Sequence, residues 1–395
     1  MIRCVCKKGY RSMLKKYIIK NGTLMSITDG AEKKADILVE DGKVTRIAEN
    51  IEAPGAEVFN AEGMYVTVGW LDAHCHFANF KPGERGGINP EDDLLKQGVT
   101  YALDLGSLGP ENYEDYREGI LYRTDLKFMS YLNISRRGCG GTVNRTDFDS
   151  ADDIDREAVI AMANKYRDEL VGLKARIDDK FCFDPEYVMG ELRSLADELD
   201  MKIAVHAPRS RIGIEKLLTY LKEGDVLCHT LAGNSDVMKV IDENGQIKPC
   251  VLEARDRGVI FDLSHGTNAY SYETAEAAWK AGFFVDTISS DLHGGNLHGP
   301  VFSLGVVMTK VRGLTGKPWY WILNKTIAEP VRLQHLKGKE LEIREGIEAD
   351  FTVFRVDNGE FEYLDSKKET RVFKEKLSPV YSCVGEKVFV CREEQ

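Results

Sequence analysis

The sequence predicts an α/β protein in which a (β/α)8 TIM barrel lies beside a small β-sandwich built from both ends of the chain. Two observations predict this class. Short apolar strands alternate with helical stretches over residues 66–330, and eight such strands can be counted, the number that closes a barrel. Strand patterns without helices flank this region on both sides. A chain of 395 residues can bury the cores of one large and one small domain.

Residues 13–65 are predicted to form the first part of the sandwich. Between two of its strands, Asp41-Gly42 is a strong signal for a two-residue hairpin turn. The expected strands cover residues 17–25, 36–40 and 43–48.

Residues 66–330 are predicted to form the barrel. Two of its helices carry clear end signals. Asp184-Pro185 places a capping carboxylate before a proline at the first helical position. A second helix over 273–280 stops at Gly282. The eight expected strands lie near 66–74, 99–105, 127–134, 170–176, 201–206, 225–229, 258–263 and 284–290.

Residues 331–395 are predicted to return to β-structure as the second part of the sandwich. Strands are expected over 350–356 and 387–391, where β-branched and aromatic residues are frequent. We expect the last strand of the chain to pair with the first and so complete the small domain.

The N-terminus and the cysteines give no sign of secretion. Residues 1–12 form a basic extension without a pattern, whose order the sequence leaves open, and Cys4 and Cys6 have no second pair nearby to complete a zinc knuckle. The nine cysteines have no repeating frame, which is typical of free thiols in a reducing compartment. No apolar run approaches the roughly 18 residues of a membrane span. We therefore expect a soluble cytoplasmic protein without a membrane partner.

The formal charge of −11 argues against a nucleic-acid-binding surface. We expect a small-molecule substrate and no nucleic-acid partner, and a homo-oligomer is left open.

His74 and His76 are the most informative pair in the chain. In an extended strand, residues i and i+2 share a face, so the two imidazoles project together and can hold one metal ion. The alternative is a pair of core histidines satisfied by hydrogen bonds. Further metal-capable side chains at the ends of other predicted strands favour the metal. They are Lys174, His206, His229 and Asp291.

Catalytic groups of a barrel come from the C-terminal ends of its strands. Six metal-capable residues at five strand ends therefore predict a metal centre. With this motif set the sequence resembles the amidohydrolase superfamily, from about Tyr17 to Cys391, including the closing segment 344–351. The resemblance implies a metal-dependent hydrolase with two divalent ions. It assigns His74, His76 and Asp291 to the more buried ion, His206 and His229 to the more exposed ion, and Lys174 to a bridge between them.

Lys174 is the sharpest clue within that superfamily. A protonated ammonium repels metal ions, whereas carboxylation by carbon dioxide makes the side chain an anionic ligand with two oxygens. The alternative is a surface lysine, or one paired with Asp178 or Asp179. Zinc suits these nitrogen and oxygen ligands, although manganese, iron and cobalt are not excluded. The expected nucleophile is a hydroxide shared by the two metals, with Asp291 carrying its proton to the leaving group.

Residues outside the metal ligands are expected to select the substrate. Arg176 shares a strand face with Lys174 and is suited to a carboxylate, unless it pairs with an acid of the protein. His265 is expected to bind the substrate or oxyanion and is the next candidate base after Asp291. His293 lies on a lid-like stretch. The glycine-rich turn over 130–141 offers backbone amides to an anion.

Three motifs resemble a narrower branch, the dihydroorotase-like amidohydrolase/deacetylase group. They are Lys-Ala-Arg at 174–176, Asp-Leu-Ser-His-Gly-Thr at 262–267 and Asp-Thr-Ile-Ser-Ser-Asp-Leu-His at 286–293. The resemblance implies cleavage of an amide or ester bond, with acetyl as the expected acyl group, in a small carboxylate-bearing substrate. One alternative is a cyclic amidase of the dihydroorotase or hydantoinase kind. Another is a non-catalytic scaffold, although all six expected ligands are present.

Overall fold

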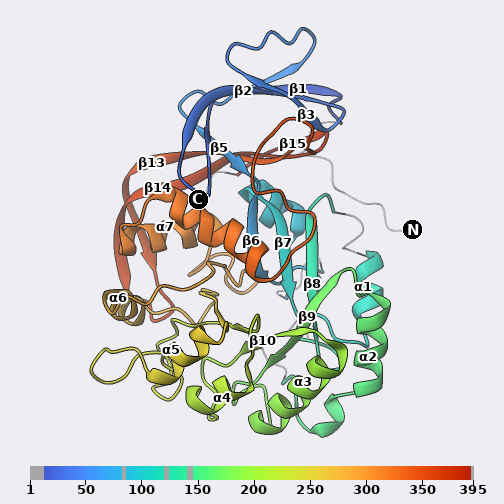
Figure 1. Cartoon of the computed structure of the whole chain (residues 1–395), viewed down its shortest axis with the longest axis vertical. Coiled ribbons are helices and arrows are strands. Elements are labelled where there is room, and N and C mark those ends of the chain that lie inside the picture. Colours follow the sequence, from blue (N-terminus) through green and yellow to red (C-terminus); the bar gives the residue numbers. More distant parts are fainter. Residues whose placement is uncertain (1–12, 82–85, 120–123, 140–145, 393–395) are drawn as a thin grey trace.

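The computed structural model describes residues 13–81, 86–119, 124–139 and 146–392 (Figure 1). Within these ranges the strands form a parallel sheet of seven strands and a second sheet of eight. The expected extension over 1–12, with Cys4 and Cys6, lies outside the described residues. No helix in the described part of the chain is long and apolar enough to cross a membrane.

The seven-stranded sheet is the barrel sheet, and the predicted fold class is confirmed. Its strands are parallel and neighbours in chain order, which is the arrangement of consecutive β/α units. The strands are β6 (Trp70–Cys75), β7 (Val99–Leu105), β8 (Lys127–Asn133), β9 (Leu170–Arg176), β10 (Lys202–His206), β11 (Val226–Leu227) and β12 (Ile260–Phe261).

The eighth strand, expected over 284–290, is not formed in the described structure. Only isolated parallel bridges from Thr287 to Asp262 and from Leu292 to Cys75 mark its position. Side chains take the place of a regular ladder. Ser290 bonds the Asp72 carboxylate through its backbone N–H, at 3.1 Å, and through its hydroxyl. The segment is therefore held beside β6 by buried carboxylates as well as by its backbone.

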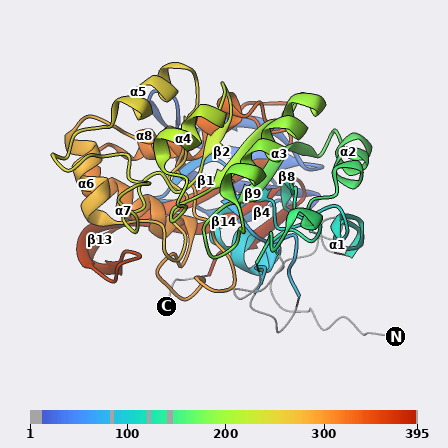
Figure 2. The same cartoon turned by 90° about the horizontal axis from the view of Figure 1, so that it is seen from below.

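Helices cover the outside of the barrel sheet. From below, α2 and α3 lie beside strands β8 and β9, and α4, α5 and α6 follow toward the left of the view (Figure 2). The predicted cap at Asp184 is present, since its carboxylate accepts from the N–H groups of Glu186 and Tyr187. The helix expected over 273–280 begins at Tyr272, where Ser271 caps it, and Gly282 follows its end with a φ of 82°. The helices are α1 (Tyr113–Gly119), α2 (Arg156–Lys165), α3 (Pro185–Leu199), α4 (Ile214–Tyr220), α5 (Pro249–Asp256), α6 (Tyr272–Lys280), α7 (Leu304–Thr315), α8 (Trp319–Leu323) and α9 (Glu329–Leu333).

The second sheet joins both ends of the chain at the top of the molecule in Figure 1. The predicted Asp41-Gly42 turn connects β2 to β3, and both turn residues have positive φ. The order is β15-β14-β13-β5-β1-β2-β3, with β4 beside β1. Its strands are β1 (Lys16–Met25), β2 (Glu32–Glu40), β3 (Lys43–Ala48), β4 (Glu57–Asn60), β5 (Tyr65–Val68), β13 (Asp350–Leu364), β14 (Thr370–Val384) and β15 (Lys387–Val390).

Two expectations about this sheet are wrong. The last strand, β15, pairs with β14 and not with β1, because a long hairpin of β13 and β14 separates them. The strand expected over 66–74 is two strands, β5 in the second sheet and β6 in the barrel. The chain changes sheet at Gly69, where a Cβ atom would overlap the side chains of Thr100 and Asp350. A glycine is needed at this junction because the two domains approach so closely.

Candidate metal centre

His74, His76 and Asp291 meet at the C-terminal end of the barrel. The Oδ1 atom of Asp291 lies 3.1 Å from Nε2 of His76 and 3.5 Å from Nε2 of His74. One potential ligand atom from each of the three residues lies within 4.8 Å of those of the other two. The Asp291 N–H donates to the His74 carbonyl at 2.7 Å, which holds the segment after the missing eighth strand against β6.

Hydrogen bonds behind the first two histidines fix the protonation of their rings. The Ser264 hydroxyl donates to Asp262 and therefore accepts from Nδ1 of His74, at 2.9 Å. The Ser107 hydroxyl donates to Asp104 and accepts from Nδ1 of His76 in the same way, at 2.9 Å. Each Nε2 atom then carries a lone pair.

Those lone pairs point toward the Asp291 carboxylate oxygen. Two nitrogen lone pairs and an anionic oxygen repel one another unless a cation lies between them. The donor set and its protonation therefore fit a divalent metal ion held by His74, His76 and Asp291.

His206 and His229 form a second pair beside the first cluster. Their ring centroids are 4.3 Å apart. His229 donates through Nδ1 to the Ser264 carbonyl at 2.7 Å, which leaves a lone pair on Nε2, 3.9 Å from the Asp291 carboxylate. This buried Nε2 atom has no hydrogen-bond partner in the described structure. An orphaned ligand atom facing the same carboxylate fits a second metal position.

Lys174 projects from β9 into the interior beside these histidines. Its residue is 1 % exposed, and its ammonium donates to the Cys228 sulfur at 3.2 Å. Within the described residues no carboxylate lies within ion-pair distance of Nζ. The alternative roles are excluded, because the side chain is buried and Asp178 and Asp179 bond Arg209 and Arg211 instead.

Burial keeps the histidines neutral. It lowers the pKa of His229 to about 3, with the neighbouring His206 adding to the effect, and it also lowers the pKa values of His74 and His206. Neutral imidazoles are the form that binds metals.

The carboxylates behind the histidines were missed in the sequence. Asp72, Asp104 and Asp262 are buried at the ends of β6, β7 and β12, and each accepts a serine hydroxyl. A signal was present: Asp72 stands two residues before His74, and Asp262 two residues before Ser264. Such alternation places a second polar group on the lumen side of a strand.

The backbone around the centre is strained at three residues. His229, Ser264 and Asp291 have φ values of 62°, 43° and 51°, in the left-handed region that side chains with a Cβ rarely adopt. All three contribute a group to the cluster. Of the ten described non-glycine residues with positive φ, these three lie at the centre, where the surrounding hydrogen bonds hold them in this conformation.

A cavity of about 360 Å³ opens above the cluster. Its floor includes His76, His206 and Asp291, and Arg176, Lys180 and Arg209 contribute basic groups to its walls. The remaining lining residues are neutral: Asn79, Gly86, Cys139, Phe181, Pro208, Thr267, Asn268, Ala269, His293 and Gly295. A space of this size fits a small molecule.

Arg176 lines the cavity but already has an anion. Its guanidinium bonds both carboxylate oxygens of Asp147, with Nε to Oδ2 at 2.7 Å, and Asp147 is buried. The alternative expected for Arg176, pairing with an acid of the protein, is therefore the one found. Arg136 and Arg137, in the glycine-rich turn over 130–141, ion-pair with Glu111 and do not line the cavity.

His265 and His293 differ in their access to the cavity. His293 lines it and bonds the Thr267 hydroxyl through Nε2 at 3.0 Å. His265 is fully buried and does not line it: Nδ1 donates to the Gly266 carbonyl, and Nε2 accepts from Lys310 at 2.9 Å. The expected contact of His265 with substrate is thus contradicted, because both ring nitrogens are used inside the protein.

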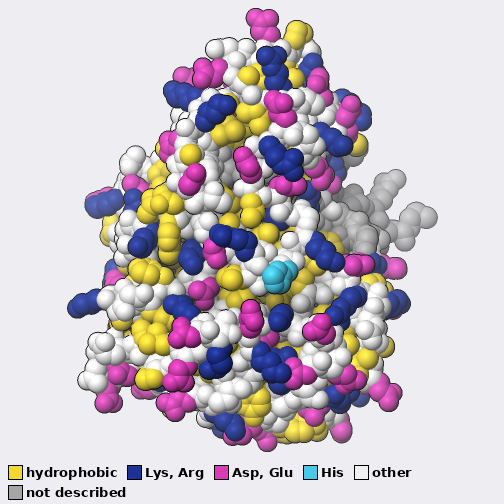
Figure 3. Space-filling model, viewed as in Figure 1, with side chains coloured by type: hydrophobic (Ala, Val, Ile, Leu, Met, Phe, Trp, Pro, Cys, Tyr) yellow, Lys and Arg dark blue, Asp and Glu magenta, His cyan; other side chains and the backbone are white. Residues whose placement is uncertain are grey.

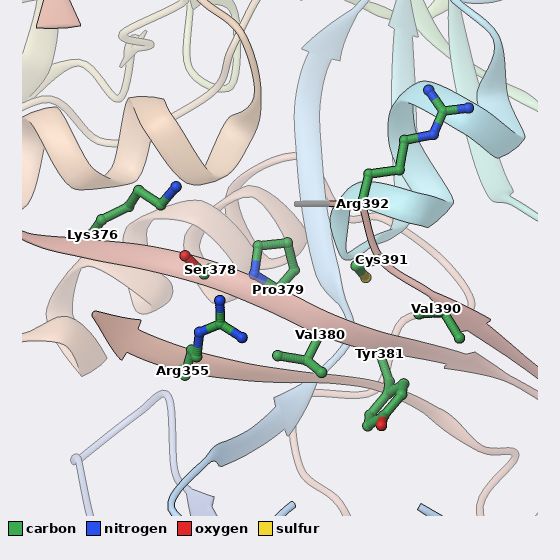
Figure 4. A pocket seen from close by; sticks show the side chains of 9 residues that line it. All are labelled: Arg355, Lys376, Ser378, Pro379, Val380, Tyr381, Val390, Cys391 and Arg392. Atoms are coloured by element: carbon green, nitrogen blue, oxygen red, sulfur yellow. The ribbon is translucent and has the colours of Figure 1, made fainter. Parts of the chain in front are cut away.

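A second hollow of about 220 Å³ lies on the eight-stranded sheet (Figure 4). It contains no histidine. Two of its basic groups are paired with acids of the protein, Arg355 with Asp357 and Arg392 with Asp92. On the face drawn in Figure 3, charges of both signs are interspersed. The barrel cavity is therefore the candidate active site.

Comparisons with known proteins agree with this geometry. A family model described as a deacetylase-like composite domain matches residues 343–389. A deacetylase from Enterococcus faecalis is 28 % identical over 94 % of this chain and 98 % of its own, and one from Agrobacterium fabrum is 27 % identical over 90 % and 86 %. Among solved structures, a dihydroorotase has a TM-score of 0.86 at 25 % identity, covering 95 % of this chain and 98 % of its own. An adenine deaminase has a TM-score of 0.82 at 26 % identity, covering 95 % and 99 %.

The barrel, the split second domain and the cluster of histidines with an aspartate define a metal-dependent hydrolase. The chain belongs to the amidohydrolase superfamily.

Proposed function

We propose that the chain is a cytoplasmic deacylase that hydrolyses an amide or ester bond, with acetyl as the acyl group, in a small carboxylate-bearing molecule. The observation that carries the proposal is the set of lone pairs from His74, His76 and His229 directed at Asp291, which requires cations. The deacetylase names of the relatives from Enterococcus faecalis and Agrobacterium fabrum support the acyl group.

Six residues would hold two divalent ions, which we propose to be zinc. His74, His76 and Asp291 would hold the first, His206 and His229 the second, and a carboxylated Lys174 would bridge them. Lys174 is buried among neutral histidines and has no carboxylate partner among the described residues, which supports its conversion to an anion. When bound, the ions would polarise the scissile carbonyl and lower the pKa of the attacking water.

Asp291 would carry the proton in this reaction. Its carboxylate faces the histidine cluster and also lines the cavity, so it reaches both the water and the substrate. It would accept a proton from the attacking water and donate it to the leaving oxygen or nitrogen. His265 takes no part in this scheme, since it lies behind the cavity wall.

A cyclic amidase is the second candidate function. The structural likeness to a dihydroorotase, with a TM-score of 0.86, favours it, and the same ligands would serve ring opening. The two functions differ in what the cavity must accept, an open acyl group or a flat ring.

Metal analysis and substrate profiling test the proposal together. The purified protein is expected to contain about two zinc ions per chain and to release acetate from N-acetyl amino acids or O-acetyl hydroxy acids. Ring opening of dihydropyrimidines or hydantoins without acetate release would favour the cyclic amidase. A protein without bound metal and without either activity would match the non-catalytic scaffold and contradict the proposal.

A further inference from the structure

Arg209 and Arg211 lie on the loop that follows β10 and are held by the same pattern of hydrogen bonds. The backbone N–H of Arg209 donates to Oδ1 of Asp178 at 2.7 Å, and its Nε donates to Oδ2 at 3.2 Å. The backbone N–H of Arg211 donates to Oδ1 of Asp179 at 3.0 Å, and its Nη1 donates to the same atom at 3.2 Å. Each arginine is thus held by one of two consecutive aspartates, through its backbone N–H and through its side chain.

The two arginines differ in what their terminal nitrogens meet. Nη1 and Nη2 of Arg211 are bonded to Asp179 and to the Phe183 carbonyl, and the residue does not line the cavity. Arg209 lines the cavity, and its side chain is 41 % exposed. Its Nη1 and Nη2 atoms have no hydrogen-bond acceptor in the described part of the chain. Arg209 therefore presents its fork of terminal donors at the wall of the cavity.

The charges of the residues that line the cavity suggest what the terminal nitrogens of Arg209 bind. Arg176 uses Nε and Nη2 for the buried carboxylate of Asp147, whereas Arg209 uses only Nε for the buried carboxylate of Asp178. Lys180 is a further basic group among the lining residues, and Asp291 at the metal centre is the one acid among the described residues that line the cavity. A planar guanidinium fork fits a carboxylate with two parallel hydrogen bonds.

We infer that Arg209 determines specificity by receiving the carboxylate of the substrate, in the role first expected of Arg176. The inference rests on the proposed function and adds the residue that selects an acidic substrate over its neutral analogue. The acyl group of the bound molecule then lies on the floor above the metal ligands, with the acidic end toward the loop after β10.

Kinetics on matched substrates test this role. For N-acetyl amino acids, Arg209→Gln is expected to lower kcat/KM by about 10- to 100-fold, mainly through KM, which is the scale of a lost charge-assisted bond. For the corresponding carboxamides the change is expected to be about threefold or less. Arg209→Lys should recover part of the activity on acids. Arg211→Gln, the matched control, should leave both substrate classes unchanged. Equal losses on acids and carboxamides in Arg209→Gln would overturn the inference.

Direct binding separates this inference from the proposed function. With zinc-loaded protein and ligand-observed NMR, the wild type is expected to bind N-acetylglycine more tightly than N-acetylglycinamide, and Arg209→Gln to lose that preference. Absence of hydrolysis with this preference intact would contradict the deacylase proposal and support the anion site. A wild type that binds both compounds equally, or neither, would overturn the anion site even if other acyl substrates are hydrolysed.

Discussion

Buried carboxylates occur at both ends of the barrel, and their partners differ. Where the barrel strands begin, Asp225 bonds Arg193 at 2.6 Å, and Asp350 bonds Lys339 at 3.0 Å. At the opposite end, Asp262 accepts three hydroxyls, from Ser264, Thr287 and Ser289. The acids beside the metal ligands thus accept hydroxyls, whereas other buried acids, among them Asp147 and Asp178 at the same end, pair with cations.

This difference separates structural charge from functional charge. An acid paired with a cation is neutralised and holds elements together. An acid that accepts a serine hydroxyl makes that oxygen accept from a histidine, as Asp104 does through Ser107 and His76. The imidazole then directs a lone pair to the cavity. Such outer hydrogen bonds orient metal ligands and tune their affinity.

Removing the proposed bridging ligand, Lys174, should have the largest effect on metal content and activity. Lys174→Ala is expected to lose at least one metal ion and nearly all activity, because the variant cannot form the anionic ligand between the ions. Metal content and acetate release are the measurements, and added short-chain carboxylic acids should partly restore both. A variant that keeps two ions and full turnover would contradict the binuclear centre.

Replacing the proposed proton carrier should have the next largest effect. Asp291→Asn keeps the size of the side chain but removes the group that accepts a proton, so kcat should fall by about 10²-fold or more. Steady-state kinetics with zinc-reconstituted protein measure the loss, and circular dichroism checks that the fold is retained. Near-normal turnover with metal bound would assign the proton transfer to another residue.

A matched pair of buried acids tests the comparison itself. Asp262→Asn replaces one of two accepting oxygens by an NH2 donor and removes the charge behind Ser264, so zinc affinity should fall by about 10- to 100-fold. Asp225→Asn weakens an ion pair with Arg193 and should lower the free energy of unfolding by about 3 kcal/mol, with zinc affinity preserved. Zinc titrations and urea unfolding of both variants provide the measurements. Equal zinc affinity in the two variants would remove the distinction between acids that accept hydroxyls and acids that pair with cations.

The sequence predicted the parts of this fold that depend on local pattern. Apolar runs and caps located the barrel strands and the helix over Pro185–Leu199, and the spacing of His74 and His76 brought both imidazoles to one cluster with Asp291. The missing eighth strand was not predictable in this way, because the ladder there is replaced by bonds to Asp72 and Asp262 from distant strands.

Pairing between distant side chains explains the errors in the site as well. Arg176 and His265 have the residue types of substrate contacts, and each follows or ends a barrel strand. Their partners, Asp147 and Lys310, lie 29 and 45 positions away along the chain. No local pattern shows that these partners are present, so spacing alone could not separate a cavity residue from one satisfied inside the protein.

Substitution of His265 is expected to have the smallest effect on catalysis. This residue lies at the end of the barrel that carries the metal ligands, yet its partner is the cation Lys310. It therefore tests whether the type of partner distinguishes structural from functional groups. Lys310 donates to His265, to the Pro300 carbonyl at 2.6 Å and to the Leu364 carbonyl at 2.8 Å, so it ties three distant segments together. His265→Leu removes one acceptor of a buried ammonium and should cost about 1–3 kcal/mol of stability. Because the ring does not reach the cavity, kcat should change by less than about 10-fold.

Urea unfolding and steady-state kinetics on the same preparation separate the two roles of His265. His265→Gln, whose amide oxygen can still accept from Lys310, should recover part of the lost stability. If His265→Leu instead lowers kcat by about 10²-fold at unchanged stability, the imidazole acts in the reaction. The type of partner would then fail to distinguish structural from functional groups at this end of the barrel.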